Sequence, residues 1–255
     1  MGVIAVFNQK GGVGKTTTCL NLAAAWVREG MRPMLLDLDP QGNLSLASGV
    51  VPQKGMGMAA FFQRQIPLLR LVQGASAGWG IIPASAELSK VDALQGSDPK
   101  AATLLSRGMN AEVRQHSPIL IDCCPSLGVL TLNALLAADR VLIPVAADYL
   151  SLQGVHRLEQ ALSVLEQRMK WKYPRRIVVT RFNPRRKLAF DVDRALRDSY
   201  GEQVCRTRIS ENAALATSPS LGQDVFHYAP QSGGAADYAA LAKELEEAGF
   251  LQAAR

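Results

Sequence analysis

Short runs of apolar residues recur along the chain, each four or five residues long. Runs of this length without polar alternation are typical of strands that are buried on both faces of a parallel sheet. The sequence predicts such strands at Val3–Phe7, Pro33–Asp37, Trp79–Pro83, Ile119–Asp122, Val141–Val145 and Ile177–Thr180. The interval from 48 to 116 is rich in Gly, Gln, Ala and Ser, and it predicts no other clear element.

Longer segments with helical periodicity lie between these runs. The clearest is Ser151–Met169, whose stripe consists of Leu152, Val155, Leu158, Leu162 and Leu165. Further helices are expected at Thr18–Trp26, Leu130–Ala138, Lys187–Tyr200 and about Ala235–Ala248, the last ended by Gly249. Because strands alternate with helices, we expect an α/β fold, a doubly wound and mostly parallel sheet with helices on both faces. The 255 residues suit a single domain, 1–255, with its site at the carboxyl ends of the strands.

The stretch Lys10–Thr17 reads Lys-Gly-Gly-Val-Gly-Lys-Thr-Thr and stands between the first strand and the first helix. Strand, glycine-rich turn and helix in this order form a phosphate-binding loop, because backbone N–H groups can surround an anion where no Cβ intervenes. The residues expected to bind a nucleotide are Gly11, Gly12, Val13, Gly14, Lys15, Thr16 and Thr17. Lys15 would contact the β- and γ-phosphates, and the Thr16 hydroxyl would bind Mg²⁺. Gln9 occupies the position where the usual pattern has its first glycine, and Lys10 follows it.

Carboxylates stand at the ends of two predicted strands. Asp37 and Asp39 end the second strand, and Asp122 ends the strand that begins at Ile119. A phosphoryl-transfer site needs a group that anchors Mg²⁺ and a group that holds the attacking water. We expect Asp122 to hold Mg²⁺ directly or through water, while Asp37 and Asp39 could both face the γ-phosphate. Asp-Pro also opens turns, so one of this pair could instead be structural.

Positive charge is concentrated in one segment. The chain has a formal net charge of +6, yet residues 168–208 alone carry 13 Lys and Arg against 4 Asp and Glu. Such a basic segment indicates a polyanionic partner, either nucleic acid or an anionic membrane. The candidate DNA contacts are Lys170, Lys172, Arg175, Arg176, Arg185, Arg186, Lys187, Arg206 and Arg208. We favour double-stranded DNA bound without sequence preference, since basic residues in loops and helix starts neutralise phosphates without reading bases.

The C-terminal segment argues against a membrane partner. Residues 243–255 contain three Glu against one Lys and one Arg, and they form no basic face beside bulky apolar residues. No apolar run is long enough to span a bilayer, and no cleavable leader precedes the first strand. The four cysteines include no C-x-x-C pair, so we expect buried thiols in a reducing compartment. The sequence therefore favours a cytoplasmic, nucleoid-associated protein.

The loop Lys10–Thr17, with its second lysine at the head, resembles the deviant Walker A loop of the ParA/MinD family of ATPases. The resemblance includes Asp37–Asn43 and Asp122–Gly128, which are similar to the family's switch I and switch II. It continues through Val145–Gly154 and Thr180–Pro184, nearly to the end of the chain. No helix-turn-helix segment precedes the loop, so the chain is most similar to short ParA-type members.

This resemblance implies ATP and Mg²⁺ as cofactors and a slow, dimer-dependent hydrolysis of ATP. Lys10 would cross to the phosphates of the partner subunit in an ATP-dependent homodimer. Asp39 would position the hydrolytic water, and Asp37 would support the metal shell. Arg181 and Asn183 would lie beside the adenine. A ParB-like or cargo-adaptor protein would stimulate hydrolysis, and the cycle would partition or position a chromosome, a plasmid or a protein assembly.

Two alternatives remain open, a MinD-like membrane-cycling regulator of division-site placement and an ATPase reductase with an iron–sulfur cluster. Adjacent cysteines, Cys123 and Cys124, fit poorly with a cluster shared on a dimer axis. The chain also departs from the family pattern twice. Cys124 replaces the first proline of D-x-P-P, which we expect to loosen switch II. Ser210-Glu211-Asn212 replaces a proline-bearing segment that contacts the base, which leaves the base contacts there open.

Overall fold

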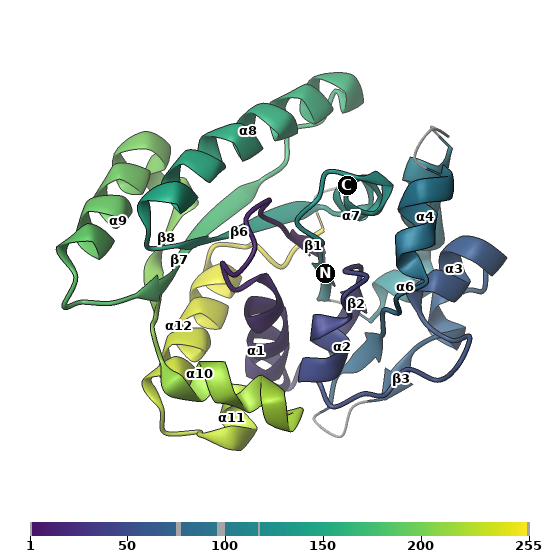
Figure 1. Cartoon of the computed structure of the whole chain (residues 1–255), viewed down its shortest axis with the longest axis horizontal. Helices are drawn as coiled ribbons and strands as arrows, with labels where there is room; N and C mark the ends of the chain where they lie inside the picture. Colours follow the sequence, from purple (N-terminus) through teal and green to yellow (C-terminus); the bar gives the residue numbers. More distant parts are fainter. Residues whose placement is uncertain (1, 75–77, 96–99, 117, 254–255) are drawn as a thin grey trace.

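The computed structural model describes residues 2–74, 78–95, 100–116 and 118–253. Its strands form one eight-stranded sheet in the order β3-β4-β2-β5-β1-β6-β7-β8, and all neighbours run parallel except β3 and β4 (Figure 1). The strands are β1 (Val3–Val6), β2 (Met34–Asp37), β3 (Gln73–Gly74), β4 (Gly80–Ile82), β5 (Ile119–Asp122), β6 (Arg140–Ala146), β7 (Arg175–Phe182) and β8 (Val204–Ser210). The doubly wound α/β architecture expected from the sequence is confirmed.

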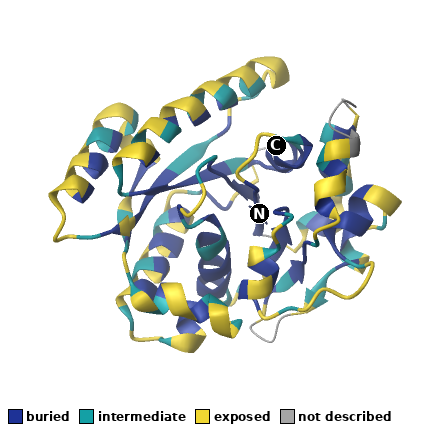
Figure 2. Cartoon of the chain, viewed as in Figure 1, coloured by how far each residue is buried: buried dark blue, intermediate teal, exposed yellow. Residues whose placement is uncertain are grey.

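Helices cover both faces of this sheet (Figures 1 and 2). They are α1 (Lys15–Arg28), α2 (Asn43–Ala47), α3 (Met58–Arg64), α4 (Leu88–Gln95), α5 (Leu104–Gly108), α6 (Ala111–Arg114), α7 (Val129–Ala137), α8 (Tyr149–Met169), α9 (Lys187–Tyr200), α10 (Ala213–Thr217), α11 (Val225–Tyr228) and α12 (Gly233–Glu247). Short 3₁₀ turns lie at Leu68–Arg70, Ala101–Thr103, Gly201–Gln203 and Ser218–Leu221.

The central strand β1 shows how the two faces are built. Because side chains alternate along a strand, Val3 and Ala5 join the hydrophobic cluster that includes residues of α7, α8 and α9. Ile4 and Val6 point the other way and pack with residues of α1 and α12. All four side chains are fully buried, which explains why this strand reads as an uninterrupted apolar run.

Neighbouring strands bring the candidate site residues to one edge. β1 lies between β5 and β6, and Val6 pairs in register with Asp122 at the carboxyl end of β5. Asp122 pairs on its other side with Asp37 at the end of β2. The loops that follow β1, β2 and β5 therefore share one edge of the sheet, as expected for a doubly wound fold.

The expected elements agree with the structure to within three residues at each end, and the helix at Lys187–Tyr200 has the expected bounds. The long helix α8 buries Val155, Leu158 and Leu162 and exposes its opposite face (Figure 2). No helix in the described ranges combines the length and the apolarity needed to cross a bilayer.

Several elements were not expected from the sequence. β8 is an edge strand that contains Arg206-Thr207-Arg208, and such a polar run lacks the apolar signature of a central strand. The interval 48–116 contains α3 to α6, which have four to eight residues each and are too short to show helical periodicity. The assignment of 1–255 to a single domain stays a prediction.

Candidate nucleotide site

The loop between β1 and α1 turns on two glycines with left-handed backbone. Gly12 has a φ angle of 73° and Gly14 one of 88°, values that strain residues with a side chain. A Cβ atom on Gly11 or Gly12 would meet no atom of the described residues within 4 Å. Gly14 is the N-cap of α1 and has no side chain, so it leaves the first N–H groups of this helix without a side-chain cap. The loop therefore leaves open space beside backbone donors, an arrangement that binds phosphate.

Lys15, the first residue of α1, is held inside this loop. The side chain is buried, and Nζ donates to the carbonyl oxygen of Lys10 at 3.0 Å. The ammonium group thus lies among the backbone atoms that would surround an anion. Val13 is also buried, and its carbonyl accepts a 2.8 Å hydrogen bond from Thr180 Oγ1, which ties the loop to the end of β7.

Thr16 and Asp122 meet below the loop, where Thr16 Oγ1 donates to Asp122 Oδ2 at 2.7 Å. Asp122 is 1% exposed, and its Oδ1 has no hydrogen-bond partner within the described part of the chain. Burial and then the charge of Asp37 raise the pKa of Asp122 well above its usual range. A buried carboxylate oxygen without a donor is unfavourable unless a cation compensates it. The hydroxyl and the carboxylate are hard oxygen ligands, so this pair fits Mg²⁺.

Asp37 anchors the turn that leads from β2 into α2. Its Oδ2 accepts hydrogen bonds from the backbone N and the Oγ of Ser45 at 2.9 and 2.7 Å. Its Oδ1 accepts a 3.2 Å bond from the backbone N of Asp39. Burial raises the pKa of Asp37 to about 6, although the Ser45 bonds act in the opposite direction. These contacts give Asp37 a structural role, and its expected part in a metal shell stays a prediction.

Asp39 lies in the same turn at the carboxyl edge of the sheet. Its Oδ1 accepts a 2.9 Å bond from the backbone N of Gln41, and its carbonyl accepts a 2.8 Å bond from Gly42. The preceding residue, Leu38, donates its backbone N–H to the carbonyl of Asp122 at 3.0 Å, so this turn runs beside the end of β5. The turn therefore holds a second carboxylate beside the candidate magnesium pair.

The side chain of Lys10 is bound within its own subunit. Its Nζ lies 2.6 Å from Asp148 Oδ1 and 3.0 Å from Ser151 Oγ. Asp148 is the N-cap of α8 and also accepts a 2.8 Å bond from the backbone N of Ser151. Burial would raise the pKa of Asp148, but the hydrogen bonds from Lys10 and Ser151 outweigh it and lower the pKa overall. The lysine expected to reach a partner subunit is therefore engaged in an ion pair that must open first.

A pocket of about 350 Å³ adjoins the loop and is lined by residues of the loop, β8 and α10. Its lining includes Gly12, Gly14 and Thr17 on one side and Ile209 and Leu215 on the other. This volume is within the range of small-molecule sites, and its contact with the phosphate loop suits the sugar and base of a nucleotide.

The two residues expected beside the base lie at the end of β7. Arg181 lines the pocket, and its Nη1 donates to the carbonyl of Gly12 at 3.4 Å. Its φ angle of 51° coincides with a shift in the register between β7 and β8. Strained backbone of this kind is common at ligand sites. Asn183 is not among the described residues that line the pocket. Its Nδ2 donates at 3.2 Å to Oε2 of Glu211, which does line it.

Comparisons with known proteins agree with this geometry. A family model described as an AAA domain matches residues 1–173. The chromosome-partitioning ATPase Soj of Thermus thermophilus is 40% identical over 246 residues, which are 95% of this chain and 94% of that protein. The chromosome partitioning protein ParA of Caulobacter vibrioides is 34% identical over 95% of this chain and 93% of that protein. The chain belongs to the ParA/MinD family of ATPases.

A solved structure of a more distant protein shares the fold of this ParA/MinD-family chain. Cobyrinic acid a,c-diamide synthase from Mycobacterium smegmatis, crystallised with an ATP analogue and magnesium, superposes with a TM-score of 0.82 at 28% identity. The match covers 98% of this chain and 97% of that protein. The sheet and its phosphate loop are those of a P-loop NTPase.

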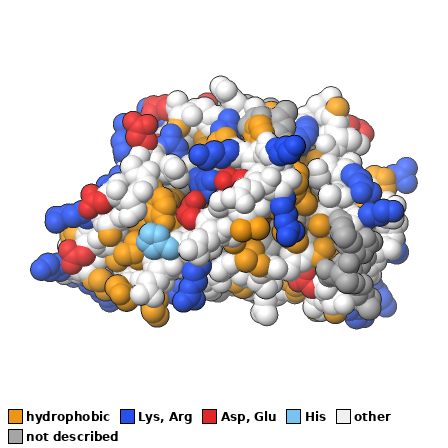
Figure 3. Space-filling view, turned by 90° about the horizontal axis from the view of Figure 1, so that it is seen from above, with side chains coloured by type: hydrophobic (Ala, Val, Ile, Leu, Met, Phe, Trp, Pro, Cys, Tyr) orange, Lys and Arg blue, Asp and Glu red, His pale blue; other side chains and the backbone are white. Residues whose placement is uncertain are grey.

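Six of the candidate DNA contacts divide between the two ends of strand β7. Lys170, Lys172 and Arg176 lie at the amino end of β7. Arg185, Arg186 and Lys187 follow its carboxyl end and are all exposed. Since β7 has eight residues, the two groups lie roughly 25 Å apart. Figure 3 shows Lys and Arg spread over the face that carries α8 and α9, not gathered into one patch.

Arg175 is not part of an accessible basic surface, contrary to the expectation from the sequence. Its side chain is 7% exposed, and it forms ion pairs with Glu159 at 2.7 Å and Glu166 at 2.5 Å. Both carboxylates come from α8, so the guanidinium joins this helix to β7. The charge of Arg175 is neutralised below the surface, which argues against its assignment as a DNA contact.

Arg206 and Arg208 lie on the edge strand β8. Arg208 Nη2 is 2.5 Å from Asp193 Oδ2, and its guanidinium stacks over the ring of Phe182 at 4.9 Å. Arg206 is 80% exposed, and its Nε lies 3.8 Å from Glu244. Both arginines have acidic neighbours, which weakens their attraction for phosphate.

The cysteines do not offer a surface for an iron–sulfur cluster, since all four are buried. Burial and then Cys124 raise the pKa of the Cys123 thiol well above its usual range, which opposes the thiolate that iron requires. Cys124 Sγ lies 3.3 Å from Thr131 Oγ1 and 3.4 Å from Ser126 Oγ. The thiol therefore packs within the switch II turn, and the expectation that it loosens this turn stays a prediction.

Three residues of the site were assigned no role from the sequence. Asn8 Nδ2 donates to the carbonyl of Pro144 at 2.8 Å, and its Oδ1 accepts from the backbone N of Lys10 at 3.0 Å. Asp148 lies two residues after β6, so the rule that site residues stand near strand ends could have found it. Glu211 directly follows β8, and that strand was not expected from the sequence.

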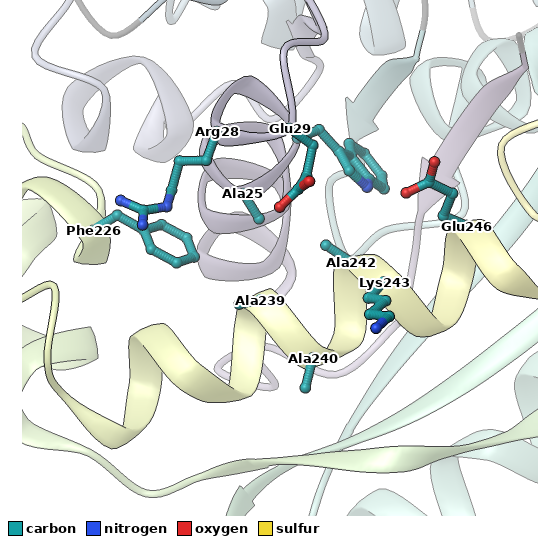
Figure 4. A pocket seen from close by; sticks show the side chains of 10 residues that line it. Ala25, Arg28, Glu29, Phe226, Ala239, Ala240, Ala242, Lys243 and Glu246 are labelled. Carbon is teal, nitrogen blue, oxygen red and sulfur yellow. The ribbon is translucent and has the colours of Figure 1, made fainter.

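A separate cavity of about 460 Å³ lies at the far end of α1, between this helix, α11 and α12 (Figure 4). Ala25, Ala239 and Ala242 form part of its wall, and the guanidinium of Arg28 lies 5.2 Å from the ring centre of Phe226. Because α1 has 14 residues, this cavity is about 20 Å from the phosphate loop. It takes no part in the nucleotide site.

Proposed function

We propose that this chain is an ATP-dependent molecular switch that dimerises on ATP, binds DNA without sequence preference and hydrolyses ATP on stimulation by a partner protein. The observation that carries the proposal is the phosphate loop above the Thr16–Asp122 pair, with a buried and unpartnered oxygen on Asp122. Relatives named as chromosome-partitioning proteins support a role in partitioning or positioning a cargo.

ATP would bind with its phosphates in the glycine loop, and Lys15 would exchange the carbonyl of Lys10 for the β- and γ-phosphates. The Thr16 hydroxyl and Asp122 would hold Mg²⁺, which neutralises charge on the phosphates. Mg²⁺ usually keeps several waters and takes one or two protein ligands beside the phosphates. The pair therefore suffices, although the described ranges contain no cluster of three His, Cys, Asp or Glu suited to a metal ion.

Hydrolysis would depend on Asp39 and Lys10. Asp39 would orient the attacking water, because its carboxylate is held in the switch I turn, which runs beside the end of β5. Lys10 would leave Asp148 and place its charge on the phosphates of the partner subunit. A cation supplied by a second subunit is a known means of stabilising phosphoryl transfer, so turnover would be slow before dimerisation.

DNA would bind to Arg185, Arg186 and Lys187, here called the α9 basic cluster. These residues are exposed and surround the first turn of α9, whose N-terminus has no side-chain cap. Free N–H groups and positive side chains together attract phosphate. The backbone N of Arg185 donates to Asn183 Oδ1 at 3.0 Å, which connects this cluster to the base pocket. A change at the nucleotide can therefore reach the DNA surface over a short distance.

A ParB-like or cargo-adaptor protein would trigger hydrolysis and release the dimer from DNA. The cargo would be a chromosome, a plasmid or a protein assembly. The names of the relatives support the chromosome as cargo, whereas the partner protein and the other cargoes rest on the resemblance to the family. The switch itself rests on the site of this chain.

The test is a gel shift on random-sequence duplex DNA with ATP, ADP or no nucleotide, at two salt concentrations. Retardation with ATP alone that weakens as salt rises would support the switch. Alanine substitution of each residue of the α9 basic cluster should weaken it, and the slope of log affinity against log salt should fall by about one for each phosphate that the variant no longer neutralises. The matched control is Lys170→Ala with Lys172→Ala at the opposite edge of the sheet. Equal or absent retardation in all three nucleotide states would overturn the proposal.

A further inference from the structure

We infer that the amino edge of the sheet carries a second anion site, in which Arg140 and Arg176 bind a phosphate group, either free or as the monoester of a small molecule. The site is a pocket of about 450 Å³ at the amino ends of β6 and β7, bordered by the turn Gly201–Gln203 and the segment that follows α12. The phosphate loop adjoins the opposite, carboxyl end of β7. The inference therefore does not depend on the proposed switch.

The two arginines project from the same face of the sheet. Arg176 pairs in register with Leu142, which is two residues beyond Arg140 on β6. Side chains alternate along a strand, so Arg140 shares a face with Leu142, and Arg176 shares one with Val178. Leu142 and Val178 both pack in the hydrophobic cluster that includes residues of α1 and α12. The strand spacing and this two-residue offset place the Cα atoms of the arginines roughly 8 Å apart, so both guanidinium groups can reach one anion.

The guanidinium of Arg140 is held in place before any ligand binds. Its Nε donates to the carbonyl of Gln252 at 3.0 Å, and its central carbon lies 5.5 Å from the ring centre of Phe250. Burial lowers the pKa of Arg140, and the charge of Asp139 acts in the opposite direction. Asp139 is itself paired with Arg114 at 2.9 Å. The charged guanidinium of Arg140 is therefore partly desolvated, an effect that a bound anion would offset.

The guanidinium of Arg176 is fixed by the backbone and not by a carboxylate. Its Nη1 donates to the carbonyl of Glu202 in the turn before β8. The carboxylate of Glu202 is exposed and also borders the pocket, yet it forms no ion pair with either arginine. Arg176 thus keeps further N–H groups that can donate to a ligand.

Positive charge in this pocket is not balanced by the protein. Within the described ranges, neither Arg140 nor Arg176 lies within ion-pair distance of a carboxylate. Lys172 lines the same pocket, is exposed and adds a third positive charge. Arg175 also lines it, but this residue is neutralised by the two glutamates of α8. Three cations therefore surround a space that the exposed Glu202 alone opposes.

The shape and the charge of the pocket favour a phosphate dianion over the backbone of DNA. Guanidinium groups match the oxygens of phosphate by paired hydrogen bonds. A phosphate monoester carries close to two negative charges and three acceptor oxygens, which suits two guanidinium groups that converge on one point. Each backbone phosphate of DNA carries a single charge. The volume of 450 Å³ is within the range of small-molecule sites and leaves room for the group that a monoester carries.

The experiment is thermal unfolding of the whole chain at pH 8, titrated with inorganic phosphate or with ribose 5-phosphate. Mg²⁺ and a non-hydrolysable ATP analogue are present throughout, so that the phosphate loop is filled. A ligand that binds the folded chain raises Tm in a saturable manner. Phosphate also stabilises folded proteins through its exclusion from their surface, so the quantity compared is the concentration at half of the saturable rise.

The wild-type chain should show a saturable rise with at least one of the two probes. Arg140→Gln combined with Arg176→Gln should raise the half-saturating concentration at least about tenfold, because charge-assisted hydrogen bonds are lost. Arg140→Lys, which keeps the charge without the planar fork, should raise it less. Arg32→Gln removes an exposed arginine outside the pocket, so this matched control should behave as the wild type.

The two probes distinguish the sources of the phosphate group. Tighter binding of ribose 5-phosphate would assign the site to a monoester, and tighter binding of inorganic phosphate would assign it to the free anion. No saturable rise with either probe, or the same half-saturating concentration in the double variant and the wild type, would overturn the site. The double variant should also retain the ATP-dependent gel shift, and loss of that gel shift would assign these arginines to DNA instead.

Discussion

Arg175→Ala should destabilise the chain strongly and leave its DNA binding intact. The Arg175 side chain is 7% exposed, and its partners Glu159 and Glu166 are 23% and 12% exposed. Removing one member of a buried ion pair costs about 3–5 kcal/mol, because the remaining charge has no counterpart. Glu159 is partly solvated, so we take the lower value, about 3 kcal/mol. For a chain of this size 1 kcal/mol corresponds to roughly 2–4 °C, which gives a fall in Tm of about 6–12 °C.

The loss of stability in Arg175→Ala should depend on pH. Burial raises the pKa of Glu159, and Arg175 acts in the opposite direction. Without Arg175 the pKa of Glu159 should rise further, so this carboxyl takes up a proton at a higher pH. The loss of stability should therefore be largest near neutral pH and smaller at about pH 5. Glu159→Gln added to Arg175→Ala should recover part of the lost Tm, since it removes one of the uncompensated charges.

Two measurements on the same variants test the prediction, thermal unfolding and the ATP-dependent gel shift. Arg185→Ala is the matched control, because Arg185 is exposed and belongs to the α9 basic cluster. Arg175→Ala should lower Tm and retain the gel shift at a temperature where it is folded, whereas Arg185→Ala should keep Tm and weaken the gel shift. An unchanged Tm together with a loss of DNA binding in Arg175→Ala would refute the structural role of this residue.

The other predictions concern the switch and one carboxylate outside it. Lys10→Ala should bind ATP but lose stimulated hydrolysis, measured by phosphate release, and normal turnover would remove Lys10 from the mechanism. Asp39→Ala should trap the ATP-bound dimer on DNA, because no group positions the water, so rapid release after ATP addition would contradict its role. Asp148→Asn removes the charge that holds Lys10 and retains an N-cap for α8. The Lys10–Asp148 ion pair is half-exposed and contributes about 0.5–1 kcal/mol per subunit. The ATP-dependent dimer of this variant should therefore form at several-fold lower protein concentration in analytical ultracentrifugation. An unchanged midpoint would show that Asp148 does not hold Lys10 back from the partner subunit. Burial would raise the pKa of Glu244, but hydrogen bonds, the largest of them from Thr207, lower this pKa overall. The charged carboxylate therefore stabilises the fold at a pH above its unfolded pKa, and the stabilisation is lost as the pH falls. The Tm deficit of Glu244→Gln should therefore be present at about pH 7 and shrink below about pH 4, while a deficit that does not change with pH would exclude the charge as its cause.

Switch II shows that the contacts of a substituted residue cannot be predicted from the family pattern alone. Cys124 is expected to loosen the turn because it replaces a residue with a fixed backbone angle. The thiol instead packs against the hydroxyl groups of Ser126 and Thr131. The contact with Thr131 depends on α7, which brings this residue next to the turn, so the residues beside Cys124 in the sequence do not predict it.

The sequence alone determined the phosphate loop and the alternation of strands and helices. Both depend on neighbouring residues, since glycines allow the left-handed turn at Gly12 and Gly14 and buried parallel strands need continuous apolar runs. Only the tertiary structure decided which charged residues are available, because Arg175 and Lys10 are engaged by carboxylates from α8 or its N-cap. Charge can be counted along a chain, but its pairing and burial depend on which helix covers which strand. The sequence likewise left the contacts of Ser210-Glu211-Asn212 open, and only the structure shows that these residues line the pocket beside the phosphate loop, because the edge strand that leads to them is polar and gives no apolar signal.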